Sequence, residues 1–364
     1  MGLALSWWHL HSRGYDPKAF LAKDALKIVL TMIVSLALFA SWFLLDPDPH
    51  AIWRDFVLRE NLGKFEAGGS YLSGLLWGSS SVWSLALAYP LNAGFLAFPI
   101  ATLLVVACRR RRELSDVEPL LWIWVIALFL VYSVPSQRSG RYLLPAMPAL
   151  AVLLALNCHR ISRKAFVGSL LAVAGVLGAI AFLSVGFQGA VPGAHLPSAH
   201  WLLLMSAGLV VLIGLVVPNL TPLSVPAASL LAFLSLAVLL RPLDGPLGRY
   251  SANVMRYVDR KDVWVPYDFV AKYEGHRFLL PGARIHGYPD DQELTPLELI
   301  ARYPLIVVRL PLGEVPCQAC AILGRRLDLQ GRQSLEELQR ILLGGGFQRL
   351  FVNEVLVEAQ GSRH

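Results

Sequence analysis

Long apolar runs occupy the first two thirds of the chain and predict membrane-spanning helices. Each of seven runs approaches or reaches the roughly 20 residues that cross a bilayer as a helix. They are Ala25–Leu45, Val82–Ala107, Leu120–Val134, Tyr142–Leu156, Ala165–Val185, Trp201–Val217 and Leu223–Leu240. The third and fourth runs are short, but tryptophan and tyrosine residues that suit the membrane interface flank them. The pattern predicts a polytopic α-helical membrane protein with about seven transmembrane helices.

After Arg241 the apolar runs shrink to strand length and charged residues become frequent. Helices are expected at Gly248–Arg260, Thr295–Arg302 and Ser334–Leu343; the last two begin with the capping-box pattern of Ser or Thr followed by Glu three residues later. Short strands are expected at Asp262–Pro266, His276–Leu280, Arg284–Tyr288, Leu305–Leu310, Ala321–Leu329 and Leu350–Glu358. We therefore divide the chain into a transmembrane helical domain, residues 1–240, and a small α/β domain, residues 241–364.

Composition and charge support a membrane protein and orient it. Hydrophobic residues make up 55% of the chain and charged residues 16%, whereas a soluble domain has about 25% charged residues. The net charge is +7, and much of it lies in three basic clusters that fall on one side if the spans alternate. These clusters are Arg13–Lys27, Arg109–Arg112 and Arg160–Lys164.

The positive-inside rule places that side in the cytoplasm of a bacterial inner membrane, together with the N-terminus. The loops Asp46–Ser81, Pro135–Arg141 and Gly186–His200 and the C-terminal domain are then extracytoplasmic. Because the basic runs are short and flank membrane helices, we expect the bilayer as a partner and no nucleic acid.

Two arginines directly precede the fourth apolar run, in the stretch SQRSGRYLLPAMPALAVLLA from Ser136 to Ala155. Arg138 and Arg141 are three residues apart and lie beside Tyr142. Both could anchor the helix end at lipid headgroups. A guanidinium also grips phosphate oxygens through paired charged hydrogen bonds, so the stretch could equally bind a phosphate.

The same stretch resembles a signature of membrane glycosyltransferases that use polyprenyl-phosphate sugars, the protein O-mannosyltransferase and aminoarabinose transferase relatives of glycosyltransferase family 39. A second stretch, DFVLRENLGKF from Asp55 to Phe65, is similar to the family's juxtamembrane segment. The resemblance implies a GT-C-like fold and covers the C-terminal half of such an enzyme. We expect the half that carries the family's catalytic acid to lie outside this chain, because the gene is truncated, the start is misplaced or a separate polypeptide supplies that half.

The implied reaction is transfer of a sugar from a polyprenyl-phosphate donor to an acceptor on the extracytoplasmic face. Arg138 and Arg141 would bind the donor phosphate, with Tyr142 as a hydrogen-bonding neighbour and Arg59 and Lys64 as auxiliary cations. No soluble cofactor is implied. Whether the chain is itself an enzyme stays open, because a non-catalytic membrane subunit or scaffold that binds lipid-linked sugar would carry the same residues.

The catalytic residue is unknown, and acidic residues of the first outer loop are the candidates that this chain offers. Asp46 and Asp48 could bind a cation or substrate, or simply belong to a rigid loop bounded by prolines. Glu60 could line the donor site, or pair with Lys64 on a solvated helix face. The spacing of histidines suggests no metal site.

Cys317 and Cys320 form a CxxC motif between two expected strands. Such a pair could be redox-active, half of a zinc site or a structural disulfide. The chain has no second CxxC to complete a zinc site, and no thioredoxin-like strand-to-helix context surrounds the motif. An extracytoplasmic location favours the structural disulfide.

Overall fold

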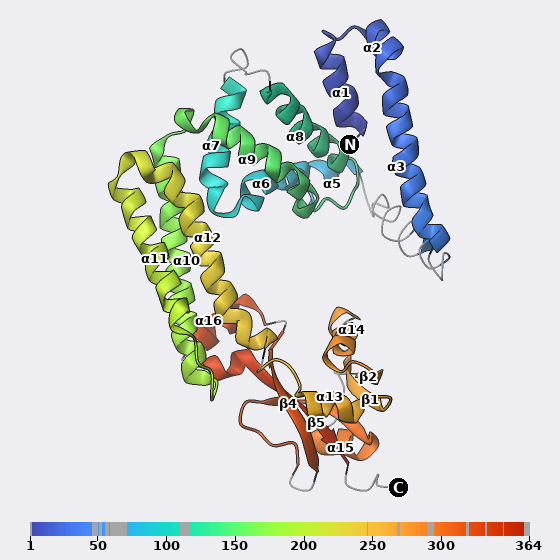
Figure 1. Ribbon diagram of the computed structural model, residues 1–364, viewed down its shortest axis with the longest axis vertical. Helices are drawn as coiled ribbons and strands as arrows, with labels where there is room; N and C mark the ends of the chain where they lie inside the picture. Colours follow the sequence, from blue (N-terminus) through green and yellow to red (C-terminus); the bar gives the residue numbers. More distant parts are fainter. Residues whose placement is uncertain are drawn as a thin grey trace. The chain divides into compact units, whose positions relative to one another are not determined.

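The computed structural model describes residues 2–45, 50, 53–54, 58, 71–109, 117–245, 247–267, 270–289, 295–317, 320–331, 333–344 and 346–359. The longer helices of the apolar part are α1 (Gly2–Ser12), α2 (Pro17–Lys23), α3 (Ala25–Leu45), α5 (Tyr71–Trp77), α6 (Val82–Asn92), α7 (Ala97–Arg109), α8 (Glu118–Ser133), α9 (Met147–Leu156), α10 (Arg163–Ala190), α11 (Ser198–Val216) and α12 (Thr221–Asp244) (Figure 1). Short 3-10 segments are η3 (Gly94–Leu96), η4 (Gly140–Ala146), η5 (Cys158–Arg160) and η6 (Pro218–Leu220).

Four helices of the described part are long and apolar enough to cross a membrane, namely Ala25–Leu45, Arg163–Ala190, Ser198–Val216 and Pro218–Asp244. A bent pair of helices raises the number to five if it counts as one span. The chain is therefore a helical membrane protein. Two shorter apolar helices, Glu118–Ser133 and Gly140–Leu156, fall below that length, so the expected total of seven spans remains a prediction.

The expected span Val82–Ala107 is not one continuous helix, because the chain turns sharply within it, and its crossing of the membrane as a single span remains a prediction. The segments Tyr71–Asn92 and Gly94–Cys108 meet at an angle of 106°. Pro90 lies inside α6 near its end, and Gly94 follows with a φ of +56°, a conformation that favours glycine. The sequence carried a signal for this break, because Pro90, Asn92 and Gly94 interrupt the apolar run.

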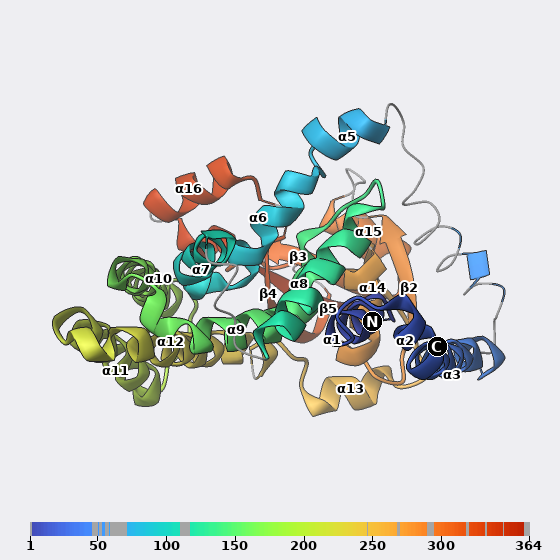
Figure 2. The ribbon, with the colours of Figure 1, turned by 90° about the horizontal axis from the view of Figure 1, so that it is seen from above.

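The chain divides into two compact units, Met1–Ala174 with Leu209–Ser229 and Gly175–Gly208 with Leu230–His364. The boundary expected between residues 240 and 241 lies inside α12, within the second unit. In the first unit α8 packs against α1 and α9, and α6 packs against η4 and α7 (Figures 1 and 2). Leucines that are at most 1% exposed fill the spaces between these helices: Leu85, Leu103, Leu143, Leu150 and Leu153.

Polar side-chain contacts join α10, α11 and α12. In the first unit, Arg163 donates from Nε to the Thr221 hydroxyl at 3.1 Å and from Nη2 to the Leu215 carbonyl at 2.5 Å. In the second unit, His200 of α11 lies 2.8 Å from the hydroxyl of Ser184 on α10 and 3.1 Å from the carbonyl of Ser235 on α12. Such contacts stabilise helix association within a membrane, where the hydrophobic effect contributes little to the free energy of association.

The C-terminal region forms a five-stranded sheet in the order β2-β1-β3-β5-β4. The strands are β1 (Asp262–Tyr267), β2 (Arg284–Pro289), β3 (Leu305–Pro311), β4 (Ala321–Leu329) and β5 (Phe351–Glu358), and the helices are α13 (Ala252–Val258), α14 (Val270–Leu279), α15 (Pro296–Arg302) and α16 (Leu335–Leu343). A last 3-10 segment is η7 (Phe347–Leu350). β1 pairs in parallel with β2 and β3, whereas β5 is antiparallel to β3 and β4.

The strand expected at His276–Leu280 is wrong, because His276–Leu279 are the last residues of α14. Since β1 and β2 are parallel neighbours, the chain between them has to cross over, and a helix is the usual crossover. The helix expected over Gly248–Arg260 is shorter, beginning after its cap Ser251 and ending at Val258. Both expected capping boxes are confirmed, at the N-termini of α15 and α16.

Apolar side chains cover both faces of this sheet. One face packs Val263, Val307 and Leu356 beneath α13 and α14, and the other packs Ile306, Val355 and Val357 beneath α15. Within the second unit, η7 lies against the end of α10. Gly186 makes this approach possible, because a Cβ there would lie 2.3 Å from the Phe347 ring. The Phe182 and Phe347 rings pack with their centres 5.2 Å apart.

Candidate functional site

The stretch that contains Arg138 and Arg141 connects α8 to η4. α8 ends at Ser133, and the chain then passes Pro135 before η4 starts at Gly140. The Tyr71 hydroxyl donates to the Val134 carbonyl at 2.6 Å, and Asn92 Nδ2 donates to the Gly140 carbonyl at 2.7 Å. These contacts come from α5 and α6, so both sides of the connection are tied to neighbouring helices.

Gly140 allows this connection to approach α6 closely. A Cβ at this position would lie 2.8 Å from the Cβ of Ala88, a distance that real Cβ atoms essentially never show. Neighbouring Leu143 is fully buried. Glycine at position 140 therefore allows the close packing against α6 that sets the backbone position of the flanking residues Arg138 and Arg141.

Arg138 is a buried cation held by neutral acceptors. The residue as a whole is only 7% exposed. Nε donates to the Ser133 carbonyl at 2.8 Å, and Nη1 donates to the Ser80 carbonyl at 3.0 Å and the Ser136 carbonyl at 3.3 Å. Its guanidinium carbon lies 5.5 Å from the centre of the Tyr71 ring. Carbonyl dipoles and a ring face orient the guanidinium, but they carry no net charge.

The remaining nitrogen of Arg138, Nη2, is buried and makes no hydrogen bond within the described part of the chain. Among the same residues, no carboxylate forms an ion pair with this arginine. A buried charge without a countercharge is costly, and an unsatisfied buried donor adds to that cost. An anion placed at Nη2 would compensate both.

Arg141 differs from Arg138 because its side chain is exposed. Its guanidinium carbon lies 5.7 Å from the centre of the adjacent Tyr142 ring, and that ring stacks on Tyr132 with the centres 5.3 Å apart. Stacking fixes the ring beneath the guanidinium. The pair of arginines thus offers one rigid, buried cation and one exposed cation three positions later.

The other expected site residues lie outside the described residues. These are the auxiliary cations Arg59 and Lys64 and the acidic candidates Asp46, Asp48 and Glu60. Their roles therefore remain predictions. Among the residues that the structure describes, no group of three or more His, Cys, Asp or Glu side chains is placed to hold a metal ion.

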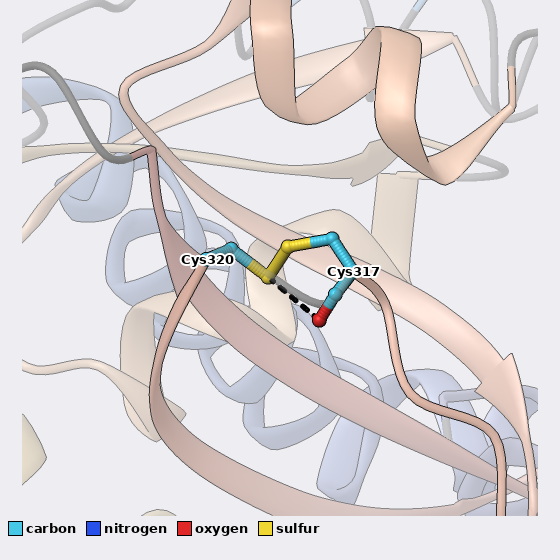
Figure 3. Close-up of a disulfide and its surroundings, with 2 residues drawn as sticks. All are labelled: Cys317 and Cys320. Atoms are coloured by element: carbon cyan, nitrogen blue, oxygen red, sulfur yellow. Dashed lines mark hydrogen bonds between the residues drawn. A yellow bond between two sulfur atoms is a disulfide. The ribbon is translucent and has the colours of Figure 1, made fainter.

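Cys317 and Cys320 are joined by a disulfide in the segment between β3 and β4, with their Cα atoms 5.7 Å apart (Figure 3). The Cys320 sulfur lies 3.7 Å from the Cys317 carbonyl oxygen. Both residues are half-buried and pack against the core beneath α15. The disulfide therefore closes a loop at the edge of a hydrophobic core.

Sequence reasoning missed a buried ion cluster that crosses three strands. Arg309 of β3 and Arg326 of β4 both face Glu354 of β5, which is 0% exposed. Glu354 accepts from Arg309 Nε at 3.1 Å, from Arg326 Nε at 2.8 Å, and lies 3.1 Å from His276 Nε2. Burial alone would raise the pKa of Glu354, but the hydrogen bond from His276 and the charges of Arg326 and Arg309 hold that pKa well below its ordinary value.

A signal for this cluster was present in the sequence. Arg309 interrupts the apolar strand LIVVRLP, and Glu354 interrupts FVNEVLVE. A charge in the middle of a buried strand requires a partner. Because Glu354 places a carboxylate between Arg309 and Arg326, the fold itself supplies their countercharge. We therefore assign the cluster to stabilisation of the sheet and not to ligand binding.

The described architecture defines a helical membrane protein that ends in a small mixed sheet. No protein-family model and no curated protein matches the chain. Among solved structures, it is similar to the crystal structure of ArnT from Cupriavidus metallidurans bound to undecaprenyl phosphate, with a TM-score of 0.46 and 17% sequence identity. The similarity covers 99% of this chain and 65% of the ArnT chain, so this chain spans less than two thirds of that protein's length.

Proposed function

We propose that this chain binds the phosphate of a polyprenyl-phosphate sugar and takes part in transferring that sugar to an acceptor hydroxyl on the extracytoplasmic side of the membrane. The observation that carries the proposal is the buried Arg138, whose Nη2 makes no hydrogen bond within the described residues. The motif from Ser136 to Ala155 and the segment from Asp55 to Phe65, which resemble polyprenyl-phosphate glycosyltransferases, support it.

The two arginines would have different tasks in this reaction. When the sugar leaves, negative charge develops on the lipid phosphate, and cations placed in advance stabilise that charge. Arg138 is suited to this because three carbonyl contacts already fix its orientation. Arg141 is exposed, so its side chain is available to reach a phosphate arriving from the lipid. Tyr142 would hold the guanidinium of Arg141 near the site.

The test is binding of a polyprenyl phosphate to the full chain in nanodiscs, measured by native mass spectrometry. A charged hydrogen bond contributes about 1.5–3 kcal/mol, so Arg138→Ala and Arg141→Ala should each weaken binding by roughly tenfold or more. Arg141→Lys should recover only part of the affinity, because an ammonium cannot reproduce the two-pronged contact.

Arg241→Ala is the matched control, because Arg241 is an exposed arginine at the end of α12 on the same expected side of the membrane. It should leave the affinity within about twofold. Equal losses in Arg141→Ala and Arg241→Ala would show that the arginines act only through membrane surface charge, and the proposal would fail. Since Arg138 is buried, folding of its variant is checked by thermal unfolding, and Arg141→Ala decides the matter if Arg138→Ala does not fold.

A further inference from the structure

The second unit contains a cavity of about 390 Å³ between the end of α10 and the sheet. This volume lies within the range of about 300–1,000 Å³ typical of small-molecule sites. Ala190, Val191 and Pro192 form one apolar wall directly after the long helix. Residues of β4 and β5, among them Arg325 and Asn353, line the cavity on the side of the sheet.

The polar part of the cavity carries one uncompensated positive charge. Arg326 also lines the cavity, but Glu354 lies 2.6 Å and Asp328 3.5 Å from its Nη2, so carboxylates balance its charge. The side chain of Arg325 is exposed and forms no ion pair or hydrogen bond with any other described residue. Arg325 is therefore the cation of the lining that no described carboxylate pairs with.

Two amide side chains complete the polar lining. Asn353 of β5 and Gln348 of η7 face the cavity and make no side-chain hydrogen bond within the described part of the chain. Each amide offers both donors and an acceptor, the combination that recognises hydroxyl groups. Arginine, in contrast, recognises planar or tetrahedral anionic oxygens.

The backbone around the cavity is fixed rather than loosely packed. Leu327 N of β4 donates to the Leu247 carbonyl at 2.6 Å, which ties the turn after α12 to the edge strand. Phe187 of α10 packs against Phe351 of β5 with ring centres 5.5 Å apart. The end of a membrane helix and the sheet are thereby held together around the cavity, within one compact unit.

We propose that this cavity binds a phosphate-bearing polyol headgroup, with the phosphate on Arg325, the hydroxyls on Asn353 and Gln348, and the apolar wall against the rest of the molecule. The ligand could come from two sources that share this chemistry, an anionic phospholipid or a soluble polyol phosphate. The site is separate from Arg138 and Arg141 and does not depend on their function.

The experiment uses the full chain in detergent and two probes, glycerol 3-phosphate by isothermal titration and phosphatidylglycerol by native mass spectrometry. Arg325→Ala should weaken binding of at least one probe by about tenfold or more, and Arg325→Lys should recover part of it. Asn353→Ala should weaken binding of the same probe through the hydroxyl contacts. Arg349→Ala, an exposed arginine that does not line the cavity, should leave binding unchanged.

The outcomes separate the sources and the two proposals. Loss for phosphatidylglycerol alone identifies a lipid headgroup, and loss for glycerol 3-phosphate identifies a soluble ligand. Arg325→Ala should keep the affinity for polyprenyl phosphate, and Arg141→Ala should keep the affinity for the two probes. No binding of either probe to the unaltered chain, or equal losses in Arg325→Ala and Arg349→Ala, would overturn the assignment.

Discussion

Glu354→Gln should destabilise the C-terminal sheet strongly, because it removes the negative charge that two buried arginines share. Glu354 is 0% exposed, and Arg326 and Arg309 are 8% and 15% exposed at their side chains. Breaking such a buried pair by changing one partner typically costs about 3–5 kcal/mol. Glutamine keeps the shape of the side chain, so the loss reports the charge and its hydrogen bonds and not a cavity.

The magnitude follows from the distances. Two unit charges 4 Å apart interact by about 4 kcal/mol at an effective dielectric constant of 20, and the closest arginine contact here is 2.6 Å. Desolvation of the three groups offsets part of this attraction, which leaves the net loss near the 3–5 kcal/mol range. With a slope of about 1–3 kcal/mol per M of urea, a loss of about 3 kcal/mol lowers the urea midpoint by about 1 M or more.

The assay is urea-dependent proteolysis of the full-length chain in detergent, with the fraction of intact C-terminal region measured after a short protease pulse. Glu336→Gln is the matched control, because Glu336 is 86% exposed and lies 3.8 Å from Arg340 on the surface of α16. That change should alter the free energy of unfolding by less than about 0.5 kcal/mol. Equal effects of the two changes would refute the argument.

A double variant tests whether the loss comes from unpaired positive charge. Arg326→Met alone should destabilise, because it breaks the same cluster. In the Glu354→Gln background, however, Arg326→Met removes a cation that has lost its partner, so it should cost much less than it does alone or even stabilise. Simple additivity of the two changes would show that the cluster contributes by packing and not by charge.

The same cluster predicts a dependence on pH. The folded-state pKa of Glu354 lies below its unfolded value of about 4.3, so its stabilisation is complete above that value. It is lost as the pH falls below the unfolded pKa toward the folded pKa. The difference in stability between the unaltered chain and Glu354→Gln should therefore shrink as the pH falls below about 4.

Two further predictions concern the disulfide and the topology. Alkylation without reductant followed by mass spectrometry should find Cys317 and Cys320 unmodified and linked; two alkylated thiols in oxidised material would exclude the bridge. Reporter fusions at Arg110 and Gly361 should report opposite sides of the membrane, with Gly361 extracytoplasmic, because the basic clusters are expected inside; the same side for both would contradict seven alternating spans.

Local features of the fold were predictable from the sequence because they depend on neighbouring residues. The capping boxes of Thr295 with Glu298 and Ser334 with Glu337 involve residues three apart, and both formed as expected. The apolar runs from Ala25 and from Ala165 likewise gave long apolar helices. Hydrophobicity and spacing contain the information for such elements.

Features that depend on distant pairing were not predictable in this way. Glu354 contacts Arg326, Arg309 and His276, which lie 28, 45 and 78 residues away in the chain, and only the strand order brings them together. The helix that ends at Leu279 was mistaken for a strand because its short apolar end has no periodicity. At the candidate site, the sequence predicted the two arginines but not that Arg138 is buried among carbonyls while Arg141 is exposed.

The environments of three arginines explain why we assign ligands to two regions of this chain and not to a third. Arg326 is buried with Glu354 and Asp328 beside it, so the fold itself balances its charge. Arg138 is equally buried, yet its described partners are carbonyl groups and a ring, which orient a guanidinium without neutralising it. Burying a cation in that way costs stability that folding does not recover. A cation fixed in place and left without a countercharge is the arrangement that an anionic ligand completes. Arg325 is exposed and pays no such cost, so its assignment rests on the cavity that it lines together with Asn353 and Gln348.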